Sequence, residues 1–451
     1  MMDHQAVLAA HPASVPRYTS YPTAPQFREG AGAVLLDALL DDFPAQEAVS
    51  VYLHIPFCDR LCWFCGCHTK YTLKYAPVKT YLGSLRREID LFSARLGVRP
   101  RLKSLHLGGG SPSLLKLQDM VQLRATLAHA FQITPNTEIS IEIDPSDSNE
   151  ELYDGLLALG VTRASIGVQD FDPQVQQAIN RPQSFEQTRD VVLRLRGIGI
   201  TSLNIDALYG LPLQTAARLR DTLAKCRDLE PDRMALFGYA HIPWFKKHQK
   251  MIREADLPGR LERFEHARMA SELLQQAGYR PIGIDHFARP ADALSKAAAS
   301  GTLHRNFQGY TTDDCRTMLG FGASSIGRSD GGYVQNIVAT GQYQQCVAQG
   351  RLPVLKGAAF SLDDRIRGHI IERLMCDFSI CFTSLEIRFG ESARVYRDEA
   401  LRIAAQDRFG LCSFSGDVLT IPRPARAFAR IVASRFDAYY HRETAQYSQA
   451  V

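Results

Sequence analysis

Short apolar runs alternate with longer amphipathic stretches through the first half of the chain. Six runs rich in β-branched and large apolar residues predict strands, at residues 51–55, 103–107, 138–143, 163–168, 202–208 and 233–238. The stretches between them carry apolar residues at helical spacing and predict helices such as 78–96, 116–131, 184–197 and 215–228. The strands recur about every 36 residues, which is typical of βα units that build a parallel sheet.

A polar or glycine-rich group lies at the end of each predicted strand. These groups are the Cys58–Cys67 segment, Gly108–Gly110, Glu142 with Asp144, Gln169, Asp206 within the fifth strand, and Tyr239–His241. Active sites of α/β barrels are built from the C-terminal ends of several strands, whereas a doubly wound sheet concentrates its site at one switch point. The pattern therefore favours an α/β barrel or partial barrel.

The two ends of the chain lack this rhythm. Residues 1–45 are irregular and punctuated by proline, with a short amphipathic helix expected near 32–42. After about residue 350 the pattern predicts helices at 361–376 and 383–409 and a small hairpin near 415–417. We expect three parts, which are an N-terminal arm (1–45), a catalytic domain (46–350) and a C-terminal accessory domain (351–451).

Composition excludes several classes of protein. The chain of 451 residues is 45% hydrophobic and 22% charged, which is ordinary globular usage and excludes a disordered chain or a coiled-coil rod. A net charge of +4 is too small to indicate nucleic acid as a partner. No run reaches the roughly 18 to 20 apolar residues of a membrane span, and Met1–Val15 lacks the pattern of a signal peptide. We expect a cytoplasmic protein and, because nothing indicates a dimerisation helix, a monomer.

Four of the ten cysteines lie within ten residues of sequence, at Cys58, Cys62, Cys65 and Cys67. The spacing C-x3-C-x2-C, followed by the fourth cysteine, places all four thiols in one loop. Soft thiolates select iron–sulfur clusters or zinc, and structural zinc sites usually take paired C-x2-C knuckles from two separated segments. The spacing therefore favours an iron–sulfur cluster with one open iron, while zinc and a set of reactive thiols stay as alternatives. The other six cysteines are expected to pack in the core.

The motif C-x3-C-x-aromatic-C, with Phe64 as the aromatic residue, resembles the signature of radical S-adenosylmethionine (SAM) enzymes. In that superfamily three cysteines bind a [4Fe-4S] cluster, and its open iron chelates the methionine part of SAM. One electron then splits SAM to give a 5′-deoxyadenosyl radical. The segment Gly108–Pro112 looks like the superfamily's glycine segment, which pairs with the methionine amino and carboxyl groups. The glycines of Gly320–Gly327 fit the same picture and lack the Lys-Ser/Thr of a P-loop.

A closer resemblance covers residues 16 to about 440. Segments that together look like those of the oxygen-independent coproporphyrinogen III oxidases are Arg17–Thr23, His54–Cys67, Asn204–Asp206, Tyr209–Pro212, Asp285–Ala288 and Arg305–Thr312. The resemblance implies an α/β fold, a partial (β/α)6 TIM-like radical SAM barrel with an N-terminal arm and a small, mainly helical C-terminal domain. It implies the oxidative decarboxylation, without dioxygen, of two propionates of coproporphyrinogen III to vinyl groups, giving protoporphyrinogen IX in haem biosynthesis. The electron donor and acceptor stay unidentified.

The resemblance also implies roles for individual residues. The cluster ligands would be Cys58, Cys62 and Cys65. Positions that match SAM contacts of the family are Tyr52, Gly109, Gly110, Ser111, Glu142, Gln169, Arg181, Asp206, Ala240 and Ile326. Cys67 would lie near the site without binding the cluster. Phe307 and Gln308 match positions beside a second SAM, so two SAM molecules per chain are expected. Because the substrate is a tetraanion, Arg17 and the Lys246–His248 stretch are candidates for binding its propionates.

Three other functions compete with this one. A haem-degrading radical SAM methyltransferase would share the cluster and SAM. A haem-binding chaperone that resembles the family would typically have another residue in place of Cys67 and lack both the Arg17–Thr23 and Arg305–Thr312 segments, all of which this chain has. A zinc-stabilised binding module would make the carboxylates at the strand ends incidental.

Overall fold

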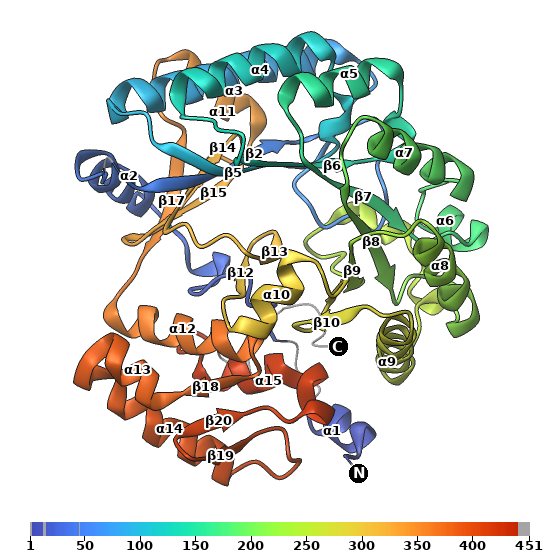
Figure 1. Ribbon diagram of the computed structural model, residues 1–451, viewed down its shortest axis with the longest axis vertical. Coiled ribbons are helices and arrows are strands. Elements are labelled where there is room, and N and C mark those ends of the chain that lie inside the picture. Colours follow the sequence, from blue (N-terminus) through green and yellow to red (C-terminus); the bar gives the residue numbers. More distant parts are fainter. Residues whose placement is uncertain (1, 12–14, 45, 441–451) are drawn as a thin grey trace.

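A sheet whose six parallel strands follow one another in chain order forms the centre of the molecule (Figure 1). The computed structural model describes residues 2–11, 15–44 and 46–440. The strands are β2 (Ala48–Ile55), β5 (Arg101–Gly109), β6 (Glu138–Ile143), β7 (Arg163–Gln169), β8 (Ser202–Tyr209) and β9 (Arg233–Gly238). Helices that follow them are α3 (Tyr75–Leu96), α4 (Leu117–Ala130), α5 (Glu150–Leu159), α7 (Phe185–Gly197), α8 (Ala216–Asp228) and α9 (Arg260–Gln276). The six predicted strands and the partial (β/α)6 barrel are confirmed.

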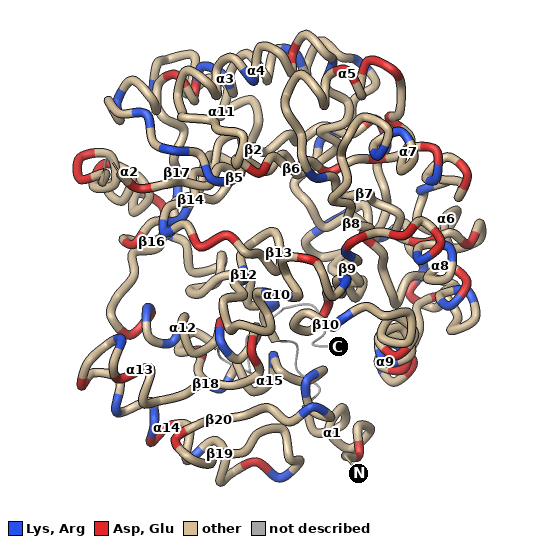
Figure 2. The backbone as a smooth tube through the Cα atoms, in the orientation of Figure 1, with Lys and Arg blue, Asp and Glu red and all other residues tan. Residues whose placement is uncertain are grey.

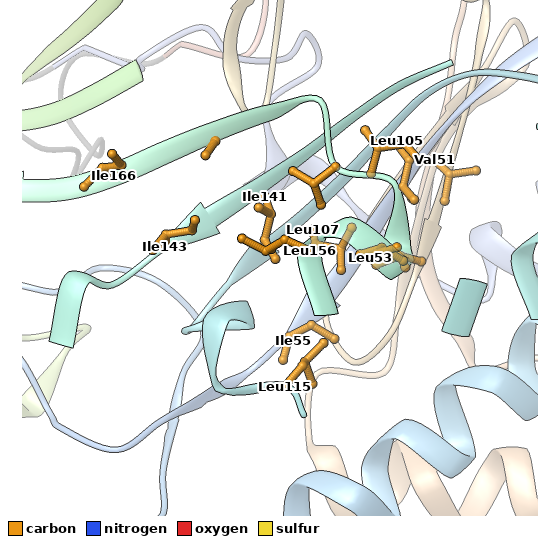
Figure 3. Close-up of a cluster of buried hydrophobic side chains, with 14 of the residues drawn as sticks. Val51, Leu53, Ile55, Leu105, Leu107, Leu115, Ile141, Ile143, Leu156 and Ile166 are labelled. Carbon is orange, nitrogen blue, oxygen red and sulfur yellow. The ribbon is translucent and has the colours of Figure 1, made fainter. Parts of the chain in front are cut away.

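Side chains on these strands alternate between two faces, as the period of a β-strand requires. On β2, Val51, Leu53 and Ile55 are almost fully buried, and Figure 3 shows them with apolar side chains of the neighbouring strands. They belong to one hydrophobic core with residues of α3 and the other outer helices. Burial of apolar surface stabilises such a layer by about 25 cal/mol per Å². The opposite face of β2 carries Tyr52 and His54, so the interior of the barrel is polar.

Strand register brings interior residues from distant parts of the sequence side by side. Tyr52 on β2 lies opposite His106 on β5, and His106 lies opposite Ser140 on β6. Two residues further along, Glu142 lies opposite Ser165 on β7. Parallel strands in one register therefore place these polar side chains on one interior wall.

The sheet continues past both ends of the six-stranded series. On one side β14 (Thr317–Phe321) pairs with β2 in parallel, and β15 (Ile326–Ser329), β16 (Gly332–Asn336), β17 (Val354–Ala359) and β1 (Arg28–Glu29) extend the sheet with antiparallel pairing. On the other side lie β11 (His286–Ala288) and β10 (Arg280–Ile282). The domain boundary expected at residue 350 precedes β17, so the sheet contains residues from both sides of it. Helix α2 (Ala31–Asp41) of the arm also packs on β17.

The C-terminal part forms a second hydrophobic core around α12 (Leu362–Cys376), α13 (Phe382–Phe389), α14 (Arg394–Ala405) and α15 (Ala429–Ala433). The stretch expected to be helical over 383–409 is divided between α13 and α14. It breaks at Gly390, whose φ of +69° is left-handed, a conformation that glycine adopts without a steric penalty. The hairpin of β19 (Ser413–Ser415) and β20 (Val418–Thr420) is confirmed and gains a third strand, β18 (Ser379–Cys381). Helix α1 (His4–Ala10) of the arm buries Val7 and Leu8 in this core. The expected domain 351–451 is described only to residue 440.

Smaller elements complete the fold. They are β3 (Phe57–Cys58), β4 (Lys70–Tyr71), α6 (Pro173–Ala178), α10 (Ala293–Ser300), β12 (His304–Asn306), β13 (Gly309–Thr311) and α11 (Thr340–Ala348). None of the helices in the described ranges combines the length and the hydropathy that a membrane span needs. Basic and acidic positions are interspersed over the outer helices (Figure 2).

Candidate active site

The loop that follows β2 contains the predicted cluster ligands. Cys58 ends β3, Cys62 is buried and Cys65 is half-buried, and all three are free thiols. Burial raises the pKa of Cys58, and charges on Cys65 and Cys62 raise it further. Three free thiols from one loop are soft donors that suit a [4Fe-4S] cluster, and the fourth iron is then left for a ligand from outside the protein.

Arg181 reaches this loop from the turn after α6. Its guanidinium donates to Cys62 Sγ at 3.5 Å, to Asp144 Oδ2 at 2.9 Å and to the Gly167 carbonyl at 2.9 Å. Burial alone would raise the pKa of Asp144, but the Arg181 charge and hydrogen bonds from Ser146 outweigh it and lower that pKa. The predicted residue Arg181 therefore lies beside Cys62, one of the predicted cluster ligands. Asp144, which the sequence placed at the end of the third strand without a specific role, orients Arg181.

Three side chains after β9 hold backbone carbonyls of the cysteine loop. The pairs are Lys246 Nζ with the Cys67 carbonyl at 2.8 Å, His248 Nε2 with the Cys65 carbonyl at 2.7 Å, and Gln249 Nε2 with the Phe64 carbonyl at 2.9 Å. Gln249 is fully buried, donates to the Ala240 carbonyl at 3.1 Å and accepts from the Ile242 N–H at 2.6 Å. Sequence reasoning missed this function and considered Lys246 and His248 as propionate partners. The one sequence signal is the polar run shortly after the sixth strand.

Cys67 is exposed and lies next to the set of three. Its backbone N–H donates to Cys65 Sγ at 3.4 Å. Hydrogen bonds from Cys67 lower the pKa of Cys65 to about 7, and the same pairing raises the pKa of Cys67. A place near the site without a bond to the cluster stays a prediction for Cys67.

The segment at the end of β5 has no room for side chains. A Cβ on Gly110 would lie 2.5 Å from the Phe57 carbonyl oxygen. Gly109 has a φ of +114°, which only glycine adopts readily. Ser111 donates its hydroxyl to Asp147 Oδ2 at 2.5 Å and its N–H to the Phe57 carbonyl at 2.7 Å. The two glycines thus allow close contacts within the protein, and Ser111 is turned toward the protein interior, so SAM binding by this segment stays a prediction.

Two predicted carboxylates face the polar interior. Glu142 accepts from the Gly109 N–H at 3.0 Å and lies 3.4 Å from His106 Nε2. Burial alone would raise the pKa of Glu142, but these two partners outweigh it and lower that pKa. Asp206 accepts from the Ser165 hydroxyl at 2.7 Å, yet burial and the Glu142 charge raise its pKa. The pair therefore gives the interior a negative potential.

Two cavities separate the residues expected around the second SAM. Glu142, Asp206 and Gln308 line a cavity of about 390 Å³ in the barrel interior, which is large enough for a small ligand. Phe307 packs edge-on against Tyr333, with 5.6 Å between ring centres, and lines another cavity of about 870 Å³ near the C-terminal part. The structure thus brings Gln308 to the carboxylates but directs the Phe307 side chain elsewhere.

The other predicted SAM contacts lie on strands or directly after them. The Tyr52 hydroxyl is 3.0 Å from His54 Nδ1. Gln169 ends β7 with a φ of +66°, Ala240 follows β9, and Ile326 begins β15. None of the four lines either cavity.

Comparison with known proteins identifies the family. Residues 52–226 match the model of the radical SAM superfamily. Oxygen-independent coproporphyrinogen III oxidase of Bradyrhizobium diazoefficiens is 44% identical over 437 residues, which cover 97% of each chain, and that of Pseudomonas aeruginosa is 38% identical over 94% of each. The solved structure of coproporphyrinogen III oxidase from Escherichia coli, described as a radical SAM enzyme, is 36% identical with a TM-score of 0.90, over 97% of this chain and 100% of that one. The chain belongs to the oxygen-independent coproporphyrinogen III oxidase family of radical SAM enzymes.

Proposed function

We propose that the protein converts coproporphyrinogen III to protoporphyrinogen IX without dioxygen, by oxidative decarboxylation of two propionates to vinyl groups. The observation that carries the proposal is the free-thiol loop of Cys58, Cys62 and Cys65 at the mouth of a polar partial barrel. Similarity to coproporphyrinogen III oxidases over 97% of the chain supports it, because the match includes the arm and the C-terminal part as well as the barrel.

In this proposal Cys58, Cys62 and Cys65 hold a [4Fe-4S] cluster, and the barrel interior holds SAM. When bound, cluster and SAM would supply the 5′-deoxyadenosyl radical chemistry needed to remove a hydrogen atom from the propionate β-carbon, and a separate electron acceptor would take up the electron released with carbon dioxide. The lowered pKa of Glu142 keeps this carboxylate ionised, which suits it to accept hydrogen bonds from a ligand amino group or ribose.

Two SAM molecules per chain are part of the proposal. Two propionates require two radicals, and Gln308 shares the 390 Å³ cavity with Glu142 and Asp206. Lys246 and Gln249 are positioning residues, because they hold the loop that carries the cluster ligands. We take the enzyme to act as a cytoplasmic monomer that draws on a separate electron donor and acceptor.

An anaerobic preparation tests the cofactor assignment. We expect a brown protein with about four irons per chain and negligible zinc. The decisive assay supplies coproporphyrinogen III, SAM and a one-electron reductant without oxygen, and follows 5′-deoxyadenosine and vinyl products together. Colourless, zinc-loaded protein would contradict the proposal. Release of 5′-deoxyadenosine without vinyl product would point to another substrate, and haem binding without turnover to a chaperone.

A further inference from the structure

Two arginines from distant parts of the chain meet at the C-terminal end of β9. Arg17 of the arm donates to the Gly238 carbonyl at 3.0 Å. Arg263 of α9 donates to the carbonyl of the next residue, Tyr239, at 2.7 Å. Burial lowers the pKa of Arg263, and the Arg17 charge lowers it further. Both arginines stand at the strand end where the barrel carries its chemistry.

Two further arginines join them from other elements. Arg305 of β12 lies over the Tyr310 ring at 4.4 Å, and its Nη2 is 3.4 Å from Asp285 Oδ2. Arg430 comes from α15 of the C-terminal part. Burial, the Arg17 charge and the Arg305 charge lower the pKa of Arg430 to about 10. Arg17 of the arm therefore lies where its charge and those of the three other guanidiniums repel each other.

One carboxylate opposes these charges most strongly. Asp285 acts on Arg17, Arg305 and Arg430 alike. Burial alone would raise its pKa, but Arg305 and His286 hold that pKa well below its usual range, so Asp285 is ionised. Asp285 Oδ1 also lies 2.7 Å from His286 Nδ1 and is therefore not fully available to the arginines. A single Asp285 charge leaves the cluster with a positive excess.

The cluster also contains donors without acceptors. The Arg305 side chain is only 3% exposed, yet its Nε and Nη1 have no hydrogen-bond partner among the described residues, and Arg263 Nε is in the same position. Buried charged donors normally have partners, so these atoms call for an acceptor from outside the chain. Arg17 and Cys67 are both exposed to solvent. Arg17 binds the end of β9, and Lys246, which follows that strand, holds the Cys67 carbonyl, so a ligand that reaches Arg17 from solvent also approaches the cysteine loop.

We propose that Arg17, Arg305 and Arg430, with Arg263 beside them, bind the propionate carboxylates of the substrate. This inference rests on the proposed function and names the groups that recognise its substrate class. A guanidinium fork matches a carboxylate in two parallel hydrogen bonds, and an incoming carboxylate relieves the repulsion among the four cations. Propionates held here keep the tetrapyrrole next to the cysteine loop.

The test uses the cluster-loaded enzyme and two stable probes, coproporphyrin III and its uncharged tetraamide. Arg17→Ala is compared with wild type and with Arg253→Ala, which removes an arginine whose side chain is 78% exposed. We expect Arg17→Ala to weaken binding of coproporphyrin III about tenfold to a hundredfold and to raise KM similarly, because it removes a charge-assisted pair. Tetraamide binding, iron content and SAM affinity should stay unchanged, and Arg253→Ala should behave as wild type.

Arg305→Lys provides a second variant that keeps the charge but removes the fork, and we expect it to weaken only the acid. Equal affinity of wild type for acid and amide, or Arg17→Ala and Arg305→Lys proteins that bind the acid as wild type does, would overturn the inference. Vinyl product from wild type together with that result would leave the proposed function intact. Absence of vinyl product from wild type would overturn both.

Discussion

Glu88 is a buried carboxylate on α3 that binds the turn before β15, and its replacement tests how its charge affects stability. Its side chain on α3 is 2% exposed. Oε2 accepts from the Gly322 N–H at 2.8 Å and from the Tyr343 hydroxyl at 2.5 Å, and Oε1 accepts from Asn336 Nδ2 at 2.6 Å. These bonds join α3 to α11 and to the turn that leads into Ile326. Burial nevertheless raises the pKa of Glu88 to about 7.

The raised pKa makes stability depend on pH with a definite sign. The pKa of Glu88 is ordinarily 4.5 and is about 7 in the folded protein. At pH values between these two, Glu88 keeps its proton in the folded protein and has released it in the unfolded chain. Stability from this group is therefore complete below pH 4.5 and is lost as the pH rises through 7. The difference corresponds to about 3 kcal/mol of unfolding free energy at pH 8. For a chain of this length, that is about 3 to 4 °C in the unfolding midpoint.

Glu88→Gln removes the titration and keeps the shape of the side chain. We expect the difference in unfolding midpoint between wild type and Glu88→Gln to fall by about 3 to 4 °C from pH 5 to pH 8.5, with an inflection near 7. Thermal unfolding of the cluster-loaded proteins across that range measures it. Glu391→Gln, at a side chain that is 84% exposed, is the matched control and should run parallel to wild type. Parallel curves for Glu88→Gln as well would refute the reasoning.

Four further changes test the site. Cys62→Ser should abolish bound iron and turnover, whereas Cys381→Ser should keep both; iron in the first variant would exclude Cys62 as a ligand. Gln249→Met removes three hydrogen bonds, so denaturant unfolding should show a loss of about 2 to 4 kcal/mol and iron content should fall; unchanged iron would mean that the clamp does not position the loop. Arg181→Lys loses the contacts of a planar fork and should slow 5′-deoxyadenosine release about tenfold at normal iron content; an unchanged rate would contradict a role beside SAM. Phe307→Ala should spare the cluster and lower vinyl product; full turnover would argue against a second SAM beside it.

The strands and the cysteine loop could be predicted because each depends on residues that are neighbours in the sequence. Strands β2 to β9 alternate apolar and polar residues with period 2, and one face is buried against amphipathic helices, so burial itself writes the pattern into the sequence. The cysteine spacing is likewise a property of one loop. Gly109 and Gly110 are where the backbone needs a left-handed φ or a close approach that no side chain permits.

The features that sequence reasoning missed depend on contacts between distant residues. Gln249 holds the Phe64 carbonyl across 185 positions, and nothing near either residue signals the partner. Ser111 matches a SAM contact of the family, but in the folded chain its hydroxyl donates to Asp147 instead. Strands such as β15 and β17 are short or half-polar, and they are set by pairing at the end of a sheet rather than by their own periodicity.

Acidic groups for one ligand and basic groups for the other come from different parts of the chain in our proposal. The barrel strands supply the acidic groups, and the arm and the C-terminal part supply arginines. Interior strands carry Glu142 and Asp206, whose negative potential suits the cationic sulfonium of SAM. The arginines come from elements outside the six strands. Val15 and Tyr18 are each 4% exposed in the C-terminal core on either side of Arg17, so that core fixes the place of this arginine, and it supplies Arg430 from α15. The barrel strands carry Lys103, Arg163 and Arg233 on the interior cavity, and in our proposal the arm and the C-terminal part add the guanidiniums that recognise a tetraanionic substrate.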